Sequence, residues 1–182
     1  DATTMVSLDL GSDSLHLHEV SEDTVERVGS VRVPVGTGPR DIVRHESGLL
    51  YILGELGGVL LVARWNGEQL RVVASSALPG FLEGDYAAAI AMHGPYLYVG
   101  LRGSNRVSVL RHSGDDGPAE AVGFVSSEGQ WPRHLATDGA LLHVANQESS
   151  SVASFRLGSD GIPSLITAPE AVPTPTHLLP AQ

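Results

Sequence analysis

Short runs of alternating or β-branched residues, separated by turn-forming residues, make up almost the whole chain. Such runs predict β-strands, and no segment carries the sustained period of an amphipathic helix. Three strands are expected first, at Thr4–Asp9, Ser14–Val20 and Glu26–Val33. Three sets of four follow: Asp41–His45, Leu49–Glu55, Val59–Trp65 and Leu70–Ala77; Ala87–Met92, Tyr96–Leu101, Arg106–Arg111 and Ala119–Ser126; His134–Thr137, Leu141–Ala145, Val152–Leu157 and Ser164–Ala168. Thr176–Leu179 stands alone at the end as a further first strand.

A polar residue closes one strand of each set at a nearly constant period. Asp9, Glu55, Arg102 and Gln147 are separated by steps of 46, 47 and 45 residues. Four-stranded antiparallel units at this spacing are typical of β-propeller blades. We therefore predict an all-β fold in one domain, with about four blades at residues 1–35, 36–80, 84–127 and 130–172 and a closing strand at 174–182.

The two ends of the pattern differ from the middle. The first blade lacks its innermost strand, whereas the last expected strand, Thr176–Leu179, is an innermost strand with nothing after it. Thr176–Leu179 could complete the first blade and close a four-bladed ring. We favour the other interpretation, in which the chain is the C-terminal part of a larger propeller. Its exposed blade edges would then need the missing propeller half or a second copy to cover them.

The composition of the chain excludes several classes of binding partner and of functional site. The formal net charge of −10 argues against nucleic acid, because phosphates require a basic surface. No cluster of basic residues indicates a membrane surface, and no apolar run approaches the roughly 20 residues of a membrane span. Cysteine is absent, so disulfides, thiolate metal sites and a cysteine nucleophile are excluded. All eleven cations are arginine, which can bind an anion in a two-pronged fork.

The candidate chemistry lies at one rim of the expected propeller. In an antiparallel blade the start of the innermost strand meets the end of its neighbour, so residues from separate blades converge there. These residues are Arg40, Asp41, Glu55, Arg102, Arg133, His134 and Gln147. Arginines can hold an anion and stabilise a developing oxyanion, and a carboxylate can activate water. The alternative is structural, because arginine and aspartate at blade rims also pair to satisfy buried loops; for Arg133 that role has equal weight.

No metal or other cofactor is expected. His16 and His18 share one face of a strand, but no third ligand accompanies them. No serine lies in a nucleophile elbow, and the glycine pairs fall in hairpins instead of phosphate-binding loops.

The sequence resembles the seven-bladed lactonase propellers, which include cycloisomerase-type 6-phosphogluconolactonases and carboxy-cis,cis-muconate cyclase. The resemblance covers nearly the whole chain, and order and spacing make it specific. Its landmarks are Asp9-Leu10-Gly11, Val35-Gly36-Thr37-Gly38-Pro39-Arg40, Leu50-Tyr51-Ile52-Leu53-Gly54-Glu55, Ala87–Ile90, Leu97-Tyr98-Val99-Gly100-Leu101-Arg102-Gly103, Glu128-Gly129-Gln130-Trp131-Pro132-Arg133, Val144-Ala145-Asn146-Gln147 and Val172-Pro173-Thr174-Pro175.

The resemblance implies hydrolysis of a sugar-derived lactone, with 6-phosphogluconolactone as the substrate to expect, in a cytoplasmic enzyme. Arg40, Glu55 and Arg102 fall on the family's catalytic or substrate-binding positions. Residues expected to bind the small anionic lactone are Arg133, His134, Asp41, Gln147 and Asp9. Two alternatives remain open, a lactonizing cycloisomerase of the muconate type and a non-catalytic binding platform.

The chain also departs from the family pattern. Asp41 stands where members often have histidine, and His134 where they often have aspartate. Gly54 and Leu101 replace frequent asparagines, and Ala89 replaces a frequent acidic residue. The family's further histidine precedes the first residue of this sequence. These departures affect the identity of the substrate and leave the Arg–Glu–Arg set intact.

Overall fold

The computed structural model describes residues 3–179, which form sixteen strands in four antiparallel sheets. The first sheet contains β1 (Thr3–Asp9), β2 (Ser14–Val20) and β3 (Val25–Arg32). The second contains β4 (Pro39–Arg44), β5 (Leu49–Gly54), β6 (Val59–Trp65) and β7 (Leu70–Ala77). The third contains β8 (Ala87–His93), β9 (Tyr96–Leu101), β10 (Arg106–Arg111) and β11 (Glu120–Ser126). The fourth contains β12 (Pro132–Asp138), β13 (Leu141–Asn146), β14 (Ser151–Leu157), β15 (Pro163–Leu165) and β16 (Glu170–Ala171).

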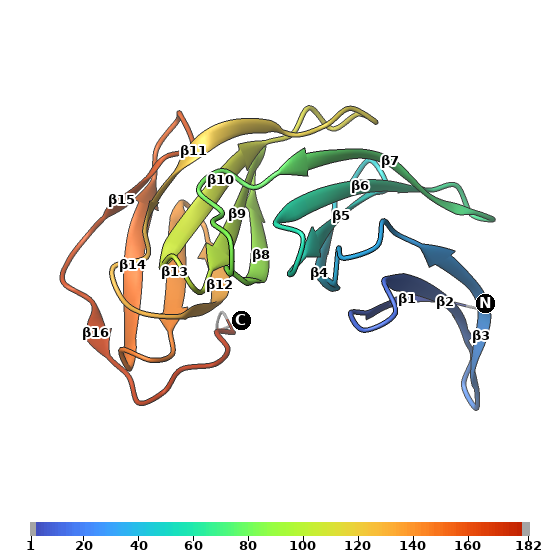
Figure 1. The fold of residues 1–182 in the computed structure, drawn as a ribbon, viewed down its shortest axis with the longest axis horizontal. Helices are drawn as coiled ribbons and strands as arrows, with labels where there is room; N and C mark the ends of the chain where they lie inside the picture. The colour runs from blue at the N-terminus through green and yellow to red at the C-terminus, as the bar shows by residue number, and fades with distance from the viewer. Residues whose placement is uncertain (1–2, 180–182) are drawn as a thin grey trace.

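The sheets stand side by side in an open arc, with the first sheet at one end and the fourth at the other (Figure 1). Strands follow one another in sequence order within each sheet except for β16, which pairs with β14, and β8 contacts both β4 and β12. The expected all-β architecture of propeller blades is thus confirmed, with a first sheet of only three strands. No helix occurs among residues 3–179. This part of the chain therefore contains no helix that is long and apolar enough to cross a membrane.

Two expectations about the C-terminal part are wrong. The strand expected at Ser164–Ala168 ends at Leu165, and β16 then pairs with the same strand, β14. Pro169 lies between the two segments, where it cannot donate to the ladder. Thr176–Leu179 forms no strand; its contacts with His134 of β12 involve that side chain and no backbone ladder. It therefore does not complete the first sheet; residues 180–182 of the expected closing strand lie outside the described part.

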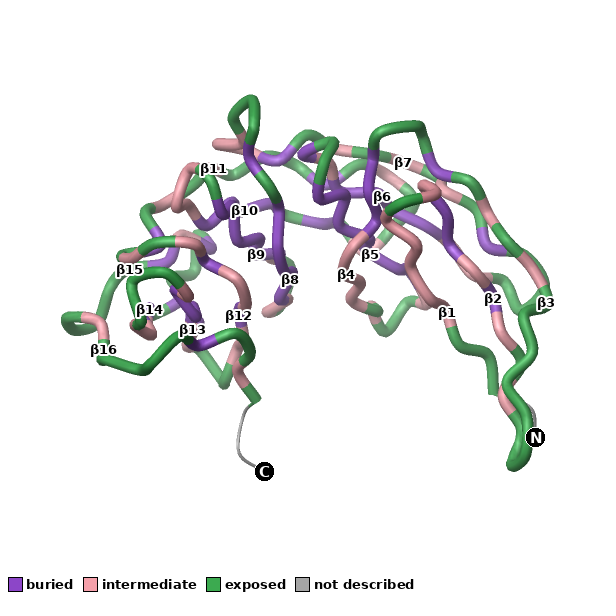
Figure 2. Tube along the Cα trace, turned by 60° about the horizontal axis from the view of Figure 1, so that its bottom comes forward, coloured by how far each residue is buried: buried purple, intermediate pink, exposed green. Residues whose placement is uncertain are grey.

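Three apolar cores lie between successive sheets. All six residues of β5 are buried, because this strand is covered on both faces by neighbouring sheets. The outer strand β7 alternates between covered and exposed positions. Figure 2 shows this contrast, with buried residues along β5, β6 and β9 and exposed residues along much of β3 and β7. The cores between the sheets consist mainly of apolar side chains, and their contacts hold each sheet against the next.

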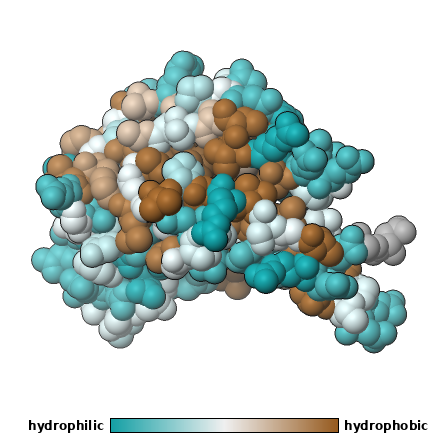
Figure 3. Space-filling view, turned by 45° about the vertical axis from the view of Figure 1, so that its right-hand side comes forward, coloured by the Kyte–Doolittle hydropathy of each residue, from teal (hydrophilic) through white to brown (hydrophobic). Residues whose placement is uncertain are grey.

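The end of the arc at the first sheet presents apolar groups to solvent. Met5, Val25 and Val28 are exposed there. Figure 3, which turns this end toward the viewer, shows apolar surface interrupted by polar groups. Strand β1 forms the edge of its sheet.

One hairpin turn is repeated inside each of the four sheets. Its left-handed residue follows β1, β5, β9 and β13 in turn, at Asp13, Gly58, Asn105 and Ser150, with φ of 49°, 57°, 55° and 48°. The carbonyl of each accepts a hydrogen bond from a residue leaving its sheet, at 2.9–3.0 Å. The Asp13 carboxylate also accepts N–H groups of Gly36 and Gly38, and the Asn105 amide oxygen accepts that of Trp131. These bonds fix the two loops that lead to Arg40 and Arg133.

Candidate active site

One end of the sheets brings the innermost strands and their neighbours together as the repeat predicts. Pro39 pairs with Gly54, Ala87 with Leu101, and Pro132 with Asn146, so each pair closes a ladder at the same rim. The residue that directly follows β5, β9 or β13 is one of the polar residues that recur at a nearly constant period in the sequence. Register therefore places Glu55, Arg102 and Gln147 beside the beginnings of β4, β8 and β12.

Glu55 lies at the centre of this rim and bridges two arginines. Its Oε2 accepts a hydrogen bond from Arg40 Nη1 at 2.7 Å, and its Oε1 accepts one from Arg102 Nη2 at 2.5 Å. Arg40 comes from β4 and Arg102 from the residue after β9, so the cluster joins two sheets. The structure thus brings together the three residues expected to be catalytic, within joint reach of one small substrate.

Arg102 is the most enclosed member of the cluster. It is 7% exposed, and its guanidinium carbon lies 5.5 Å from the ring centre of Tyr86 and 5.3 Å from that of Trp131. Burial lowers the pKa of Arg102, while the carboxylate of Glu55 opposes that shift. A guanidinium that is paired and flanked by rings is held in one orientation, as a donor for a developing oxyanion must be.

Arg40 and Asp41 both cross from β4 to β8. Arg40 Nε donates to the carbonyl of Ala88 at 2.7 Å, and Asp41 Oδ2 accepts from the N–H of Ile90 at 2.9 Å. Asp41 therefore has the structural role considered above, because it accepts hydrogen bonds from backbone N–H groups. Arg40 combines a hydrogen bond to a backbone carbonyl with the ion pair to Glu55.

A second group lies at the start of β12. Arg133 Nη1 donates to Gln147 Oε1 at 3.2 Å. The ring centre of His134 lies 3.8 Å from that of His177, and His134 Nδ1 accepts the N–H of Leu178 at 3.2 Å. Burial, and then the neighbouring His177, lower the pKa of His134, with Asp41 acting in the opposite direction. When the His134 ring is neutral, its proton lies on Nε2, because Nδ1 accepts the N–H of Leu178.

The expected ligand Asp9 does not join these groups. Its Oδ1 accepts the N–H of Ser12, and its Oδ2 lies 3.5 Å from His16 Nε2. Hydrogen bonds from Ser12 lower the pKa of Asp9, whose side chain is 44% exposed. No innermost strand runs beside β1 in the described part, so Asp9 has no rim partner and caps its own turn.

Three residues near the site were missed from the sequence: Tyr86, Trp131 and His177. The available signal was a short repeat in the sequence, because Trp131-Pro132-Arg133-His134 and Pro175-Thr176-His177 both resemble Gly38-Pro39-Arg40-Asp41. Tyr86 lies in the loop before β8 and carried no repeat signal. The described residues contain no group of three or more histidine or acidic side chains placed to hold a metal ion.

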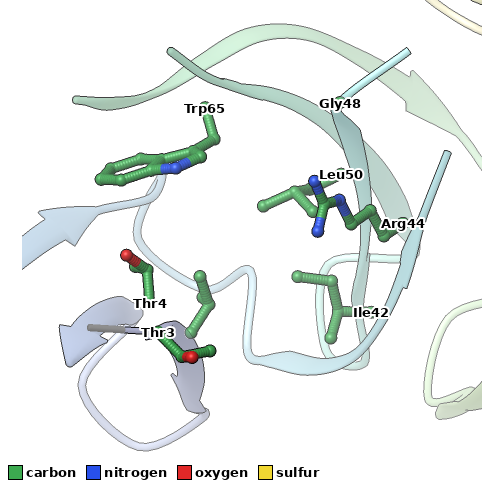
Figure 4. A pocket seen from close by; sticks show the side chains of 8 residues that line it. Thr3, Thr4, Ile42, Arg44, Gly48, Leu50 and Trp65 are labelled. Carbon is green, nitrogen blue, oxygen red and sulfur yellow. The ribbon is translucent and has the colours of Figure 1, made fainter. Parts of the chain in front are cut away.

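A hollow of about 400 Å³ lies between the first and second sheets, away from these residues (Figure 4). It is lined mainly by apolar side chains and threonines, with Arg44 as its charged residue and no carboxylate or imidazole. Arg44 ends β4, the strand that begins with Pro39 and Arg40, so this hollow lies toward the opposite rim. It offers no acid or base for chemistry.

Comparisons with known proteins identify the family of the chain. The family described as "Lactonase, 7-bladed beta-propeller" matches residues 1–180. A 6-phosphogluconolactonase of Bacillus subtilis is 29% identical, aligning with 94% of this chain and 52% of its own length. A 6-phosphogluconolactonase of Formosa agariphila is 33% identical, over 81% of this chain and 46% of its own length. The chain therefore spans about half the length of these curated relatives.

Solved structures share the fold. A Lactobacillus plantarum protein superposes with a TM-score of 0.89 at 24% identity, covering 96% of this chain and 54% of its own. The periplasmic gluconolactonase of Pseudomonas aeruginosa superposes with a TM-score of 0.87 at 24% identity, covering 95% and 52%. With its blade-like sheets and a family match over nearly its whole length, the chain belongs to the seven-bladed β-propeller lactonase family.

Proposed function

We propose that the full-length protein hydrolyses a sugar-derived lactone at the rim that holds Arg40, Glu55 and Arg102. The observation that carries the proposal is the convergence of these three side chains, from two sheets, in one hydrogen-bonded cluster. The 6-phosphogluconolactonases named above support the choice of substrate class. A platform that only binds would not need this convergence.

The cluster has the groups that ring opening requires. Each oxygen of Glu55 accepts one guanidinium N–H, which leaves a lone pair free to accept a proton from water. Water attacks the lactone carbonyl while Glu55 takes the proton. Arg102 and Arg40 stabilise the oxyanion of the tetrahedral intermediate. When that intermediate collapses, the bond from the carbonyl carbon to the ring oxygen breaks. Protonated Glu55 returns the proton to the ring oxygen, leaving the open hydroxy acid.

A pH-stat assay tests this proposal directly. The full-length protein should hydrolyse 6-phosphogluconolactone well above the rate of spontaneous opening, and Glu55→Gln and Arg102→Ala should each remove most of the excess. Product analysis separates a hydrolase from a cycloisomerase, because only the hydrolase consumes water. Turnover unchanged in both variants would sink the proposed site.

The proposal extends to assembly and location. The edge of β1 and the exposed apolar groups of the first sheet need a cover, which further blades of the ring or a second copy would supply. Light scattering on the full-length protein distinguishes a monomeric ring from a dimer. We also infer a cytoplasmic location, which cell fractionation against a periplasmic marker tests.

A further inference from the structure

A hollow of about 370 Å³ adjoins the Arg–Glu–Arg cluster. Ala88 and Ala89 of β8 form part of its wall, and its polar lining is Arg40, Asp41, Arg133, His134, Thr176 and His177. Arg40 belongs both to this lining and to the ion pair with Glu55, so the hollow and the cluster are contiguous. Its volume lies in the range of small-ligand sites, at roughly 300–1,000 Å³.

The charges of the hollow are not balanced by the protein. Arg40 and Arg102 share the single carboxylate of Glu55. Among the described residues, Arg133 has no carboxylate within 4.0 Å. Asp41 also lines the hollow, but its two oxygens accept the N–H groups of Ile42 and Ile90. An unpaired guanidinium beside two others favours an anion.

Arg133 is held so that it can receive such an anion. Its Nη1 donates to the neutral amide oxygen of Gln147, which orients the guanidinium and leaves its other N–H groups available. The segment that supplies Thr176 and His177 is tied to β12 through the bond from Leu178 N–H to His134. A hydroxyl and an imidazole therefore lie in the same hollow as the guanidinium.

We propose that this hollow is the subsite for the phosphate group of a phosphorylated sugar lactone, with Arg133 as its anchor and Thr176 and His177 as further ligands. The inference rests on the proposed function and deepens it. A lactone ring without a phosphate is uncharged, so it gives the unpaired Arg133 no partner. A phosphate has several acceptor oxygens and can take a two-pronged guanidinium contact together with a hydroxyl donor. The reacting carbonyl then lies toward Glu55.

Equilibrium binding tests the subsite apart from catalysis. Calorimetry on the full-length protein would compare 6-phosphogluconate with gluconate, two product acids that differ only in the phosphate. We expect 6-phosphogluconate to bind at least about tenfold more tightly. Arg133→Gln should weaken 6-phosphogluconate about tenfold to a hundredfold and leave gluconate unchanged. Arg133→Lys should restore part of the preference, because it keeps the charge and loses the fork. His177→Asn should reduce the preference by a smaller factor.

Arg111→Gln is the matched control, because Arg111 ends β10 at the opposite rim and pairs there with Glu120. It should leave both affinities unchanged. Inorganic phosphate should bind far more weakly than 6-phosphogluconate; equal affinity would overturn the assignment to a sugar phosphate. Lactone hydrolysis with a phosphate preference that Arg133→Gln does not alter, or an equal loss of both ligands, would overturn the subsite. An Arg133-dependent preference in a protein without lactone turnover would support the subsite and refute the proposed function.

Discussion

Arg102 lies against Glu55 inside the rim, with Nη2 2.5 Å from Oε1 and both residues less than a tenth exposed. Removing two charges from water costs free energy that their attraction does not always return. A buried ion pair is therefore weak evidence for stability. Its position at the rim, between strand ends of the second and third sheets, where Arg40 adds a second guanidinium, favours a role in binding and chemistry.

Glu55→Gln tests this relationship in two ways. The amide cannot accept a proton from water, so kcat for lactone opening should fall by about 10²–10⁴. The variant also leaves Arg102 enclosed without its counter-ion. We expect a loss of up to about 3 kcal/mol in the free energy of unfolding, since the rim opens to solvent on one side. Urea unfolding and steady-state kinetics measure the two effects. Glu120→Gln, in an exposed pair with Arg111, is the control and should change neither.

Arg102→Lys separates charge from geometry. Lysine keeps the positive charge, but it cannot reach Glu55 while stacking between the rings of Tyr86 and Trp131. We expect kcat to fall by about 10²–10³, the usual loss of one oxyanion donor, with the fold retained. Activity close to the wild type would show that a point charge suffices, and the fork geometry would lose its role.

Much of the rim was predictable because it follows the strand period. Glu55 and Arg102 occupy equivalent places in successive sheets, and register alone brings them to one edge. Asp9 has the same place in the period, yet its side chain turns to Ser12, because contact at the rim also requires an innermost strand beside it. The repeat period of the sequence predicts where a residue lies along its sheet, but it does not show whether a neighbouring strand is present beside it.

The remaining contacts had no periodic signal. Tyr86 and Trp131 reach Arg102 from loops, and loop side chains follow no strand alternation. His177 was expected in a strand that does not form, although its contact with His134 places it near the rim. Contacts between sheets depend on the packing angle of whole blades, which a single sequence does not specify.

His112 predicts how stability depends on pH. Burial is the main cause that lowers the pKa of His112 below its ordinary 6.5; a hydrogen bond to the carbonyl of Gly94 opposes this, and His45 adds to it. The folded chain therefore resists a proton that the unfolded chain accepts. Stability should be full above about pH 6.5 and should fall as the pH decreases toward the folded pKa.

His112→Phe keeps a ring in this position and removes the titration. Its free energy of unfolding should decrease less than that of the wild type between about pH 7.5 and about pH 5. Urea unfolding at several pH values measures the difference, and His93→Phe, on neighbouring β8, is the matched control. Parallel profiles for the wild type and His112→Phe would assign the pH dependence to other groups.

Glycine occupies the left-handed position in only one of the four equivalent turns, at Gly58, and a substitution there tests the reason. Its φ of 57° is no greater strain than that of Asn105 at 55°, which has a side chain. The ring of Phe81 adds a second and larger constraint to the strain of the left-handed backbone, because a Cβ on Gly58 would overlap Phe81 Cδ1. Gly58→Ala should therefore lower the free energy of unfolding by about 1–3 kcal/mol, the usual cost of overpacking. In the Phe81→Ala background the same change should cost much less, and a double-mutant cycle from urea unfolding measures this coupling. Additive costs in the cycle would mean that the backbone, and not the ring, requires glycine.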